Sequence, residues 1–122
     1  MPKIRPEELD DRRGSGDVFV LDIRPEDRFR EGHVEGSYNV PVYHDLRSGD
    51  TDALADALDR IPSDDEVVVV CKVGVVSRRA TSFLREQGYD ATTLAGGMRG
   101  WRGYENDTLW YRATSTVRRL LS

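Results

Sequence analysis

The chain has 122 residues, with 18 Lys and Arg against 22 Asp and Glu, which gives a formal net charge of −4 at pH 7. This length predicts a single domain with one modest core. The acidic balance argues against a nucleic-acid partner, because such proteins need a clustered basic face. No run reaches the ~18–20 apolar residues of a membrane helix, and the first residues lack the apolar stretch of a signal peptide. We therefore expect a soluble cytoplasmic protein with no membrane partner.

Short apolar runs alternate with helix-like segments along the chain. This alternation is typical of an α/β domain whose parallel strands are covered on both faces. Residues 18–21 predict a buried strand, and Pro25 then opens a short helix at residues 26–30. A short strand follows at residues 38–40, and the polar stretch at residues 44–51 predicts a loop.

The middle of the chain predicts a helix and then the central strand of the sheet. The helix covers residues 52–60 and is capped by Thr51 or Asp52. Residues 67–70 are four consecutive valines, the most β-branched run in the chain. Such a run packs well when both faces of a strand are covered, so we place it in the middle of the sheet.

The last third of the chain predicts one long helix, one strand and a terminal segment. Ser77 can cap a helix that ends at Gly88, and a strand follows at residues 91–94. A turn then leads into a short helix that carries Trp101. We expect residues 104–122 to form an arm or helix packed on the domain.

The chain has a single cysteine, Cys71, so it cannot form an internal disulfide. With only His33 and His44 beside it, a structural zinc site lacks ligands, and we expect no metal. Cys71 is therefore either an inert core residue or a reactive one.

The sequence around Cys71 favours the reactive interpretation. Cys71 follows a buried strand, Gly74 permits a tight turn, and a helix begins near Ser77. Loop amides can converge on the sulfur in this arrangement and form an anion cradle, which favours a nucleophilic thiolate. The alternative is a small apolar residue that ends a valine strand. The carboxyl edge of a parallel sheet is where ligands bind, which favours chemistry.

Four segments in order, within residues 3–103, resemble the rhodanese-like sulfurtransferase family. They lie at residues 20–29, 31–41, 71–77 and 94–101. The third matches the family's loop, usually Cys-x-x-Gly-x-Arg followed by Ser or Thr. The resemblance implies a three-layer α/β/α fold with a central, mostly parallel sheet flanked by helices, and it leaves residues 104–122 as the terminal arm.

The resemblance also implies a mechanism without a cofactor. Cys71 accepts a sulfane sulfur from a small donor, becomes a persulfide, and passes the outer sulfur to an acceptor such as a thiol, cyanide or a protein. The residues implied to bind substrate are those of the loop: Lys72, Val73, Gly74, Val75, Val76 and Ser77.

Val76 stands where the family usually has Arg. The loop therefore lacks the guanidinium that would pair with a doubly charged donor such as thiosulfate. We expect thiosulfate to be a poor donor and a low-charge persulfide to be a better one.

Three further residues are candidates for supporting roles. Asp22 and Arg24 lie at the carboxyl end of their strand, where they pair with each other or with loop amides. We expect Asp22 to lock the loop rather than touch substrate, whereas Arg24 fits either role. Arg78 lies in the first helical turn after the loop, where its side chain points either toward the loop or away from it.

Two other classes of function compete with sulfur transfer. The first is a non-catalytic rhodanese module that recruits or regulates a partner. Val76, in the position where the family usually has Arg, favours this class. The second is a phosphatase or arsenate reductase of the same fold. That class is the less favoured, because it uses an Arg where this chain has Ser77, and its loop is suited to a larger anion.

Overall fold

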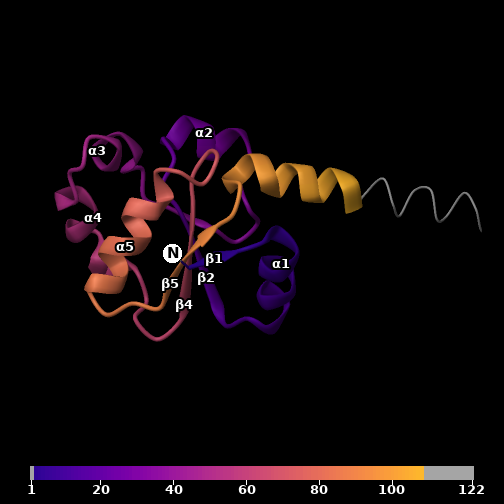
Figure 1. Cartoon of the computed structure of the whole chain (residues 1–122), viewed down its shortest axis with the longest axis horizontal. Helices are drawn as coiled ribbons and strands as arrows, with labels where there is room; N and C mark the ends of the chain where they lie inside the picture. Colours follow the sequence, from indigo (N-terminus) through magenta and orange to yellow (C-terminus); the bar gives the residue numbers. More distant parts are fainter. Residues whose placement is uncertain (1, 109–122) are drawn as a thin grey trace, which may run out of the picture.

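The structure is a computed structural model that describes residues 2–108. Within this range one five-stranded sheet has the order β1-β5-β4-β2-β3, and every neighbouring pair is parallel (Figure 1). The strands are β1 (Lys3–Ile4), β2 (Val18–Asp22), β3 (Tyr38–Asn39), β4 (Glu66–Val70) and β5 (Ala91–Leu94).

Helices cover both faces of this sheet. They are α1 (Pro6–Ser15), α2 (Glu26–Glu31), α3 (Tyr43–Arg47), α4 (Asp52–Asp56), the 3₁₀ turn η1 (Leu58–Arg60), α5 (Ser77–Glu86) and a helix at residues 97–108. Figure 1 shows α3, α4 and α5 on one side of the strands, and α1 on the other. The expected three-layer fold with its parallel sheet is confirmed.

The valine strand β4 explains why two layers of helices are needed. Val67 and Val69 belong to the core cluster that includes residues of α3, α4 and α5. Val68 and Val70 belong to the opposite cluster, with residues of α1 and helix 97–108. All four side chains are fully buried because successive side chains of a strand point to opposite faces.

Two elements near the amino terminus, β1 and α1, are absent from the sequence prediction. Leu9 is the one buried residue of α1, so this helix has no periodic apolar face for a pattern to show. Pro6 at its start and the left-handed Gly16 at its end bound it instead.

Two predicted boundaries between Pro41 and Ile61 are wrong. Residues 44–51 are not all loop, because α3 occupies residues 43–47 and anchors itself through Leu46, which is fully buried. The helix at residues 52–60 is not continuous, because the chain tightens at Ala57 into η1. The helices α3 and α4 each bury a single residue, Leu46 and Leu54. One buried residue per helix gives too little apolar periodicity for the sequence to predict either helix boundary.

The end of the described chain bears on the expected terminal arm. Residues 97–108 form one continuous helix, so the first part of the segment 104–122 extends that helix. Residues 109–122 lie outside the described residues. No helix among the residues described is long and apolar enough to span a membrane.

Candidate active site

Cys71 lies at the carboxyl end of β4, between the ends of two neighbouring strands. β4 pairs with β2 on one side and with β5 on the other. The segments that follow these three strands therefore meet at one edge of the sheet, which is the usual place for ligands in an open parallel sheet. The side chain of Cys71 is buried, with 1% of its surface exposed.

The loop after β4 directs polar groups at the sulfur. The backbone N–H of Gly74 lies 3.1 Å from Cys71 Sγ, and that of Ser77 lies 3.4 Å away. The Ser77 hydroxyl oxygen lies 3.2 Å from the same sulfur. These groups form a cradle at the start of α5, where backbone N–H groups and the helix dipole stabilise negative charge.

The role of Ser77 differs from the one that the sequence suggests. We predicted that its side chain caps α5, but Val76 is the N-cap residue and makes no side-chain capping bond. Ser77 is the first helical residue, and its buried hydroxyl faces Cys71 Sγ instead. The prediction of a Ser77 cap is therefore wrong, whereas its place beside the sulfur agrees with the expected loop.

The start of helix 97–108 holds the other side of the loop. The N–H of Met98 donates to the carbonyl of Cys71 over 2.8 Å, and the N–H of Arg99 donates to the carbonyl of Lys72 over 3.1 Å. Gly97 adopts φ +56°, and a Cβ atom there would lie 2.4 Å from the Cys71 carbonyl oxygen. Only glycine permits this close approach.

The sequence does not predict these backbone contacts at the candidate site. The sequence does carry a signal for them, namely the Gly96-Gly97 pair directly after β5. A double glycine there indicates that two backbones approach closely, but it does not identify which segment lies opposite.

The remaining loop residues divide into exposed and half-buried ones. Val73 and Val75 are 42% and 60% exposed, and Lys72 and Arg78 are also exposed. Val76 is half-buried and packs against the core cluster beneath α5. The side chain that replaces the family's usual Arg thus contributes to packing.

Asp22 and Arg24 pair with each other at the end of β2. Both are buried, and the Arg24 guanidinium donates to both carboxylate oxygens of Asp22, with Nη2 at 2.8 Å from Oδ2. Arg24 also donates to the carbonyl of Gly32, and Asn39 Nδ2 donates to the carbonyls of Asp22 and Arg24. Of the two expected arrangements, the structure shows the mutual pair. Together these bonds tie the end of β2 to Gly32 after α2 and to Asn39 of β3.

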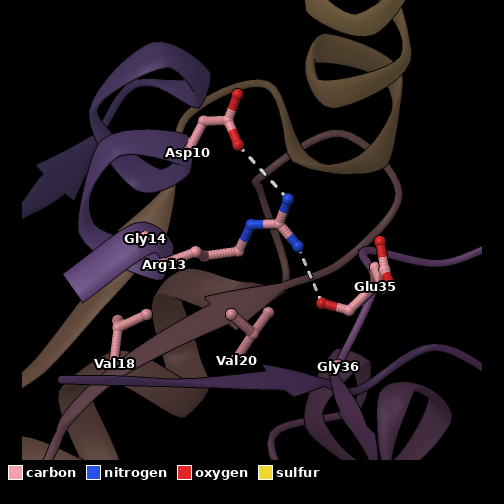
Figure 2. Close-up of a pocket in the computed structure, with 7 residues that line it drawn as sticks. All are labelled: Asp10, Arg13, Gly14, Val18, Val20, Glu35 and Gly36. Atoms are coloured by element: carbon pink, nitrogen blue, oxygen red, sulfur yellow. Dashed lines mark hydrogen bonds and ion pairs between the residues drawn. The ribbon is translucent and has the colours of Figure 1, made fainter. Parts of the chain in front are cut away.

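A separate pocket of about 450 Å³ lies away from this edge. Figure 2 shows Arg13 crossing it, with one nitrogen at Asp10 and another at the carbonyl of Glu35. Val18 and Val20 of β2 also line it, and no residue of the Cys71 loop does.

The comparisons with known proteins give the family. The family profile of the rhodanese-like domain matches residues 5–104. A thiosulfate sulfurtransferase of Shewanella oneidensis is 33% identical over 85 residues, which cover 69% of this chain and 75% of that one. A transcriptional regulator of the helix-turn-helix type from Mycobacterium tuberculosis is 31% identical over 97 residues, which cover 78% of this chain but 39% of that protein.

The solved structures agree on the fold. A rhodanese-related protein from Thermoplasma volcanium superimposes with a TM-score of 0.68 at 23% identity, covering 85% of this chain and 93% of that one. The fold and the cysteine at the carboxyl edge of its parallel sheet agree with the arrangement that the resemblance to rhodanese-like domains implies. The chain belongs to the rhodanese-like domain family, as its four sequence segments indicate.

Proposed function

We propose that the protein is a sulfurtransferase that carries sulfane sulfur as a persulfide on Cys71. The observation that supports this most directly is the cradle of Gly74 N–H, Ser77 N–H and Ser77 hydroxyl around the sulfur. Its donors stabilise an anionic sulfur both before and after loading. The sulfurtransferase name of a relative at 33% identity supports the same activity.

The proposed reaction has two displacement steps. The Cys71 thiolate attacks the outer sulfur of a persulfide donor, the donor's S–S bond breaks, and the donor leaves as a thiolate. An acceptor thiolate then attacks the outer sulfur of the Cys71 persulfide, the new S–S bond breaks, and the Cys71 thiolate returns. Electrons and atoms balance without a metal or an organic cofactor. Lys72, Val73, Gly74, Val75, Val76 and Ser77 would surround the transferred sulfur.

Mass spectrometry of the intact protein tests the proposal. After incubation with a small persulfide donor, the protein should gain about 32 Da for one sulfur atom, and a thiol should remove it. Cys71→Ser keeps the size of the side chain and should gain nothing. A gain of the same mass in Cys71→Ser, or no gain in the wild type, would contradict the proposal.

A second candidate is a non-catalytic module that recruits a partner. Two observations favour it: the deep burial of Cys71 and the use of Val76 for packing. The match to part of a transcriptional regulator shows that the domain also occurs in a longer protein of another named function. Persistent failure of Cys71 to load, in a protein that remains folded, would favour this candidate.

A further inference from the structure

The cations of the described residues divide into paired and unpaired ones. Six arginines form ion pairs with carboxylates: Arg5, Arg12, Arg13, Arg24, Arg28 and Arg30. Within residues 2–108, six other cations form neither an ion pair nor a hydrogen bond through their side chains: Lys3, Arg47, Lys72, Arg78, Arg99 and Arg102. Three of these six, Lys72, Arg78 and Arg99, lie in the Cys71 loop or in the two helix starts that hold it, in a chain whose net charge is −4.

These three cations belong to the segments that surround the sulfur. Lys72 follows Cys71 directly, and Arg78 follows Ser77, whose hydroxyl lies beside the sulfur. Arg99 belongs to the opposite side, where its N–H donates to the Lys72 carbonyl. Two of the three carboxylates of helix α2, Glu26 and Glu31, pair with arginines of the same helix, and Asp27 is the one that does not.

Apolar side chains stand among these cations. Val73 and Val75 are 42% and 60% exposed, although they belong to the loop that buries the sulfur. Exposed apolar residues beside a functional group, with charges around them, indicate a surface that a partner covers. A small sulfur anion would use the charges but would gain nothing from the two valines.

A groove of about 450 Å³ lies along α5 and shares one residue, Arg78, with this surface. Its lining also includes Leu46, Thr51, Arg79, Phe83 and one carboxylate, Glu86. Arg78 therefore belongs both to the rim of the loop and to the groove. An acceptor that contacts both the loop and the groove is larger than a small sulfur compound.

We propose that the acceptor is a protein whose cysteine lies in an acidic segment, and that this segment docks on Lys72, Val73, Val75, Arg78 and Arg99. We call these five residues the docking surface. The proposal rests on the proposed function, because docking brings the acceptor thiol to a persulfide on Cys71. The acidic side chains pair with the three cations, and apolar side chains beside the cysteine cover the two valines.

Binding of unreactive peptides tests the docking surface without sulfur transfer. We would measure the affinity of three labelled peptides with serine in place of cysteine and with acidic, neutral or basic flanks. The acidic peptide should bind about 10-fold more tightly than the neutral one at low salt, and the difference should shrink at high salt. Equal affinities for the acidic and basic peptides, or an affinity no better than that of free glutamate, would overturn the proposal.

Matched variants separate the docking surface from net charge. Arg78→Gln with Arg99→Gln should weaken binding of the acidic peptide about 3- to 10-fold. Arg5→Gln with Arg12→Gln removes the same charge from α1 and the residue before it, and should leave this affinity unchanged. Val75→Asn keeps every charge and should also weaken binding. Equal losses in the two double variants would show that only net charge matters and would overturn the proposal.

The transfer step then distinguishes the two proposals. Loaded wild-type protein should pass its sulfur to the acidic cysteine peptide faster than to the basic one. If Cys71 never loads but the acidic peptide still binds selectively, the proposed function fails and the docking surface stands. If Cys71 loads and transfers equally to both peptides, the proposed function stands and the docking surface fails.

Discussion

The cradle around Cys71 consists mainly of backbone groups, so its side-chain requirements fall on few residues. Ser77 supplies a hydroxyl and an N–H, and Gly74 supplies an N–H at φ +86°. The side chains of Val73 and Val75 are exposed to solvent. The loop therefore accepts varied side chains at its exposed positions while the geometry at the sulfur stays the same.

Val76→Arg should change the choice of donor. We expect wild-type protein to load from a low-charge persulfide and only poorly from thiosulfate. The added guanidinium should raise thiosulfate loading about 10- to 100-fold, because a charge-assisted hydrogen bond to the departing group stabilises the transition state. Loading rates from both donors, with Val75→Arg as an exposed control, would test this. Equal use of thiosulfate by wild type and Val76→Arg would show that another cation supplies the charge.

Asp22→Asn should destabilise the fold. The change leaves the buried Arg24 guanidinium without its countercharge, which costs about 3–5 kcal/mol of unfolding free energy. Glu26→Gln breaks an exposed pair with Arg30 and should cost less than about 1 kcal/mol. Urea unfolding of the three proteins measures both effects. A loss in Asp22→Asn as small as that in Glu26→Gln would mean that water reaches Arg24.

At the scale of elements, three strand ends and two helix starts build the site. β4 delivers the cysteine, and the start of α5 supplies the N–H of Ser77. The start of helix 97–108 binds the carbonyls of Cys71 and Lys72. The loop is therefore held from both sides by helix N-termini, whose unpaired N–H groups need acceptors.

Gly97→Ala should disturb this clamp. Its Cβ would lie 2.4 Å from the Cys71 carbonyl oxygen and 2.8 Å from Gly74 N, at a φ that disfavours alanine. We expect a loss of about 3 kcal/mol in stability and slower sulfur loading of Cys71. Thermal unfolding and intact mass would measure the two effects.

Gly103→Ala in the same helix is the matched control. A Cβ atom at Gly103 meets nothing within 4 Å, so alanine there should be neutral or stabilise the protein by up to about 1 kcal/mol. Equal behaviour of the two alanine variants would contradict the close approach at Gly97.

At the scale of the whole molecule, contacts between distant segments fix helix 97–108 to α1. Trp101 is buried, and the Arg13 guanidinium lies 5.1 Å from the centre of its ring. The Tyr104 hydroxyl donates to Asp10 Oδ2 over 2.6 Å. The hydrogen bond to Asp10, followed by burial, raises the pKa of Tyr104 above its ordinary value.

The raised pKa of Tyr104 predicts a pH dependence of stability. The neutral hydroxyl is favoured in the folded protein, so its contribution is complete below the ordinary tyrosine pKa of about 10 and is lost as the pH rises through the folded value. The difference in melting temperature between wild type and Tyr104→Phe should therefore be constant near neutral pH and decline at alkaline pH. A difference that does not change up to alkaline unfolding would contradict the bond.

The sequence by itself determined the family and the parallel α/β fold, and it singled out Cys71 as the candidate nucleophile. The local signals are a run of valines, a cysteine, a glycine and a helix start. Their order and spacing predict the fold and the candidate chemistry without any information on distant contacts. The helix α1 and the turn of helix at α3 left no such signal, because each has one buried anchor.

The tertiary structure alone decided what surrounds the loop. Gly97 approaches Cys71, and Val76 packs against the core, so both contacts join separate segments. Asp22 pairs with Arg24, which selects one of the two partners that the sequence left open. The absence of ion pairs at the described docking surface is likewise a property of three separate elements placed together. Each of these depends on distances between residues far apart in sequence, and residue types at a given spacing do not specify those distances.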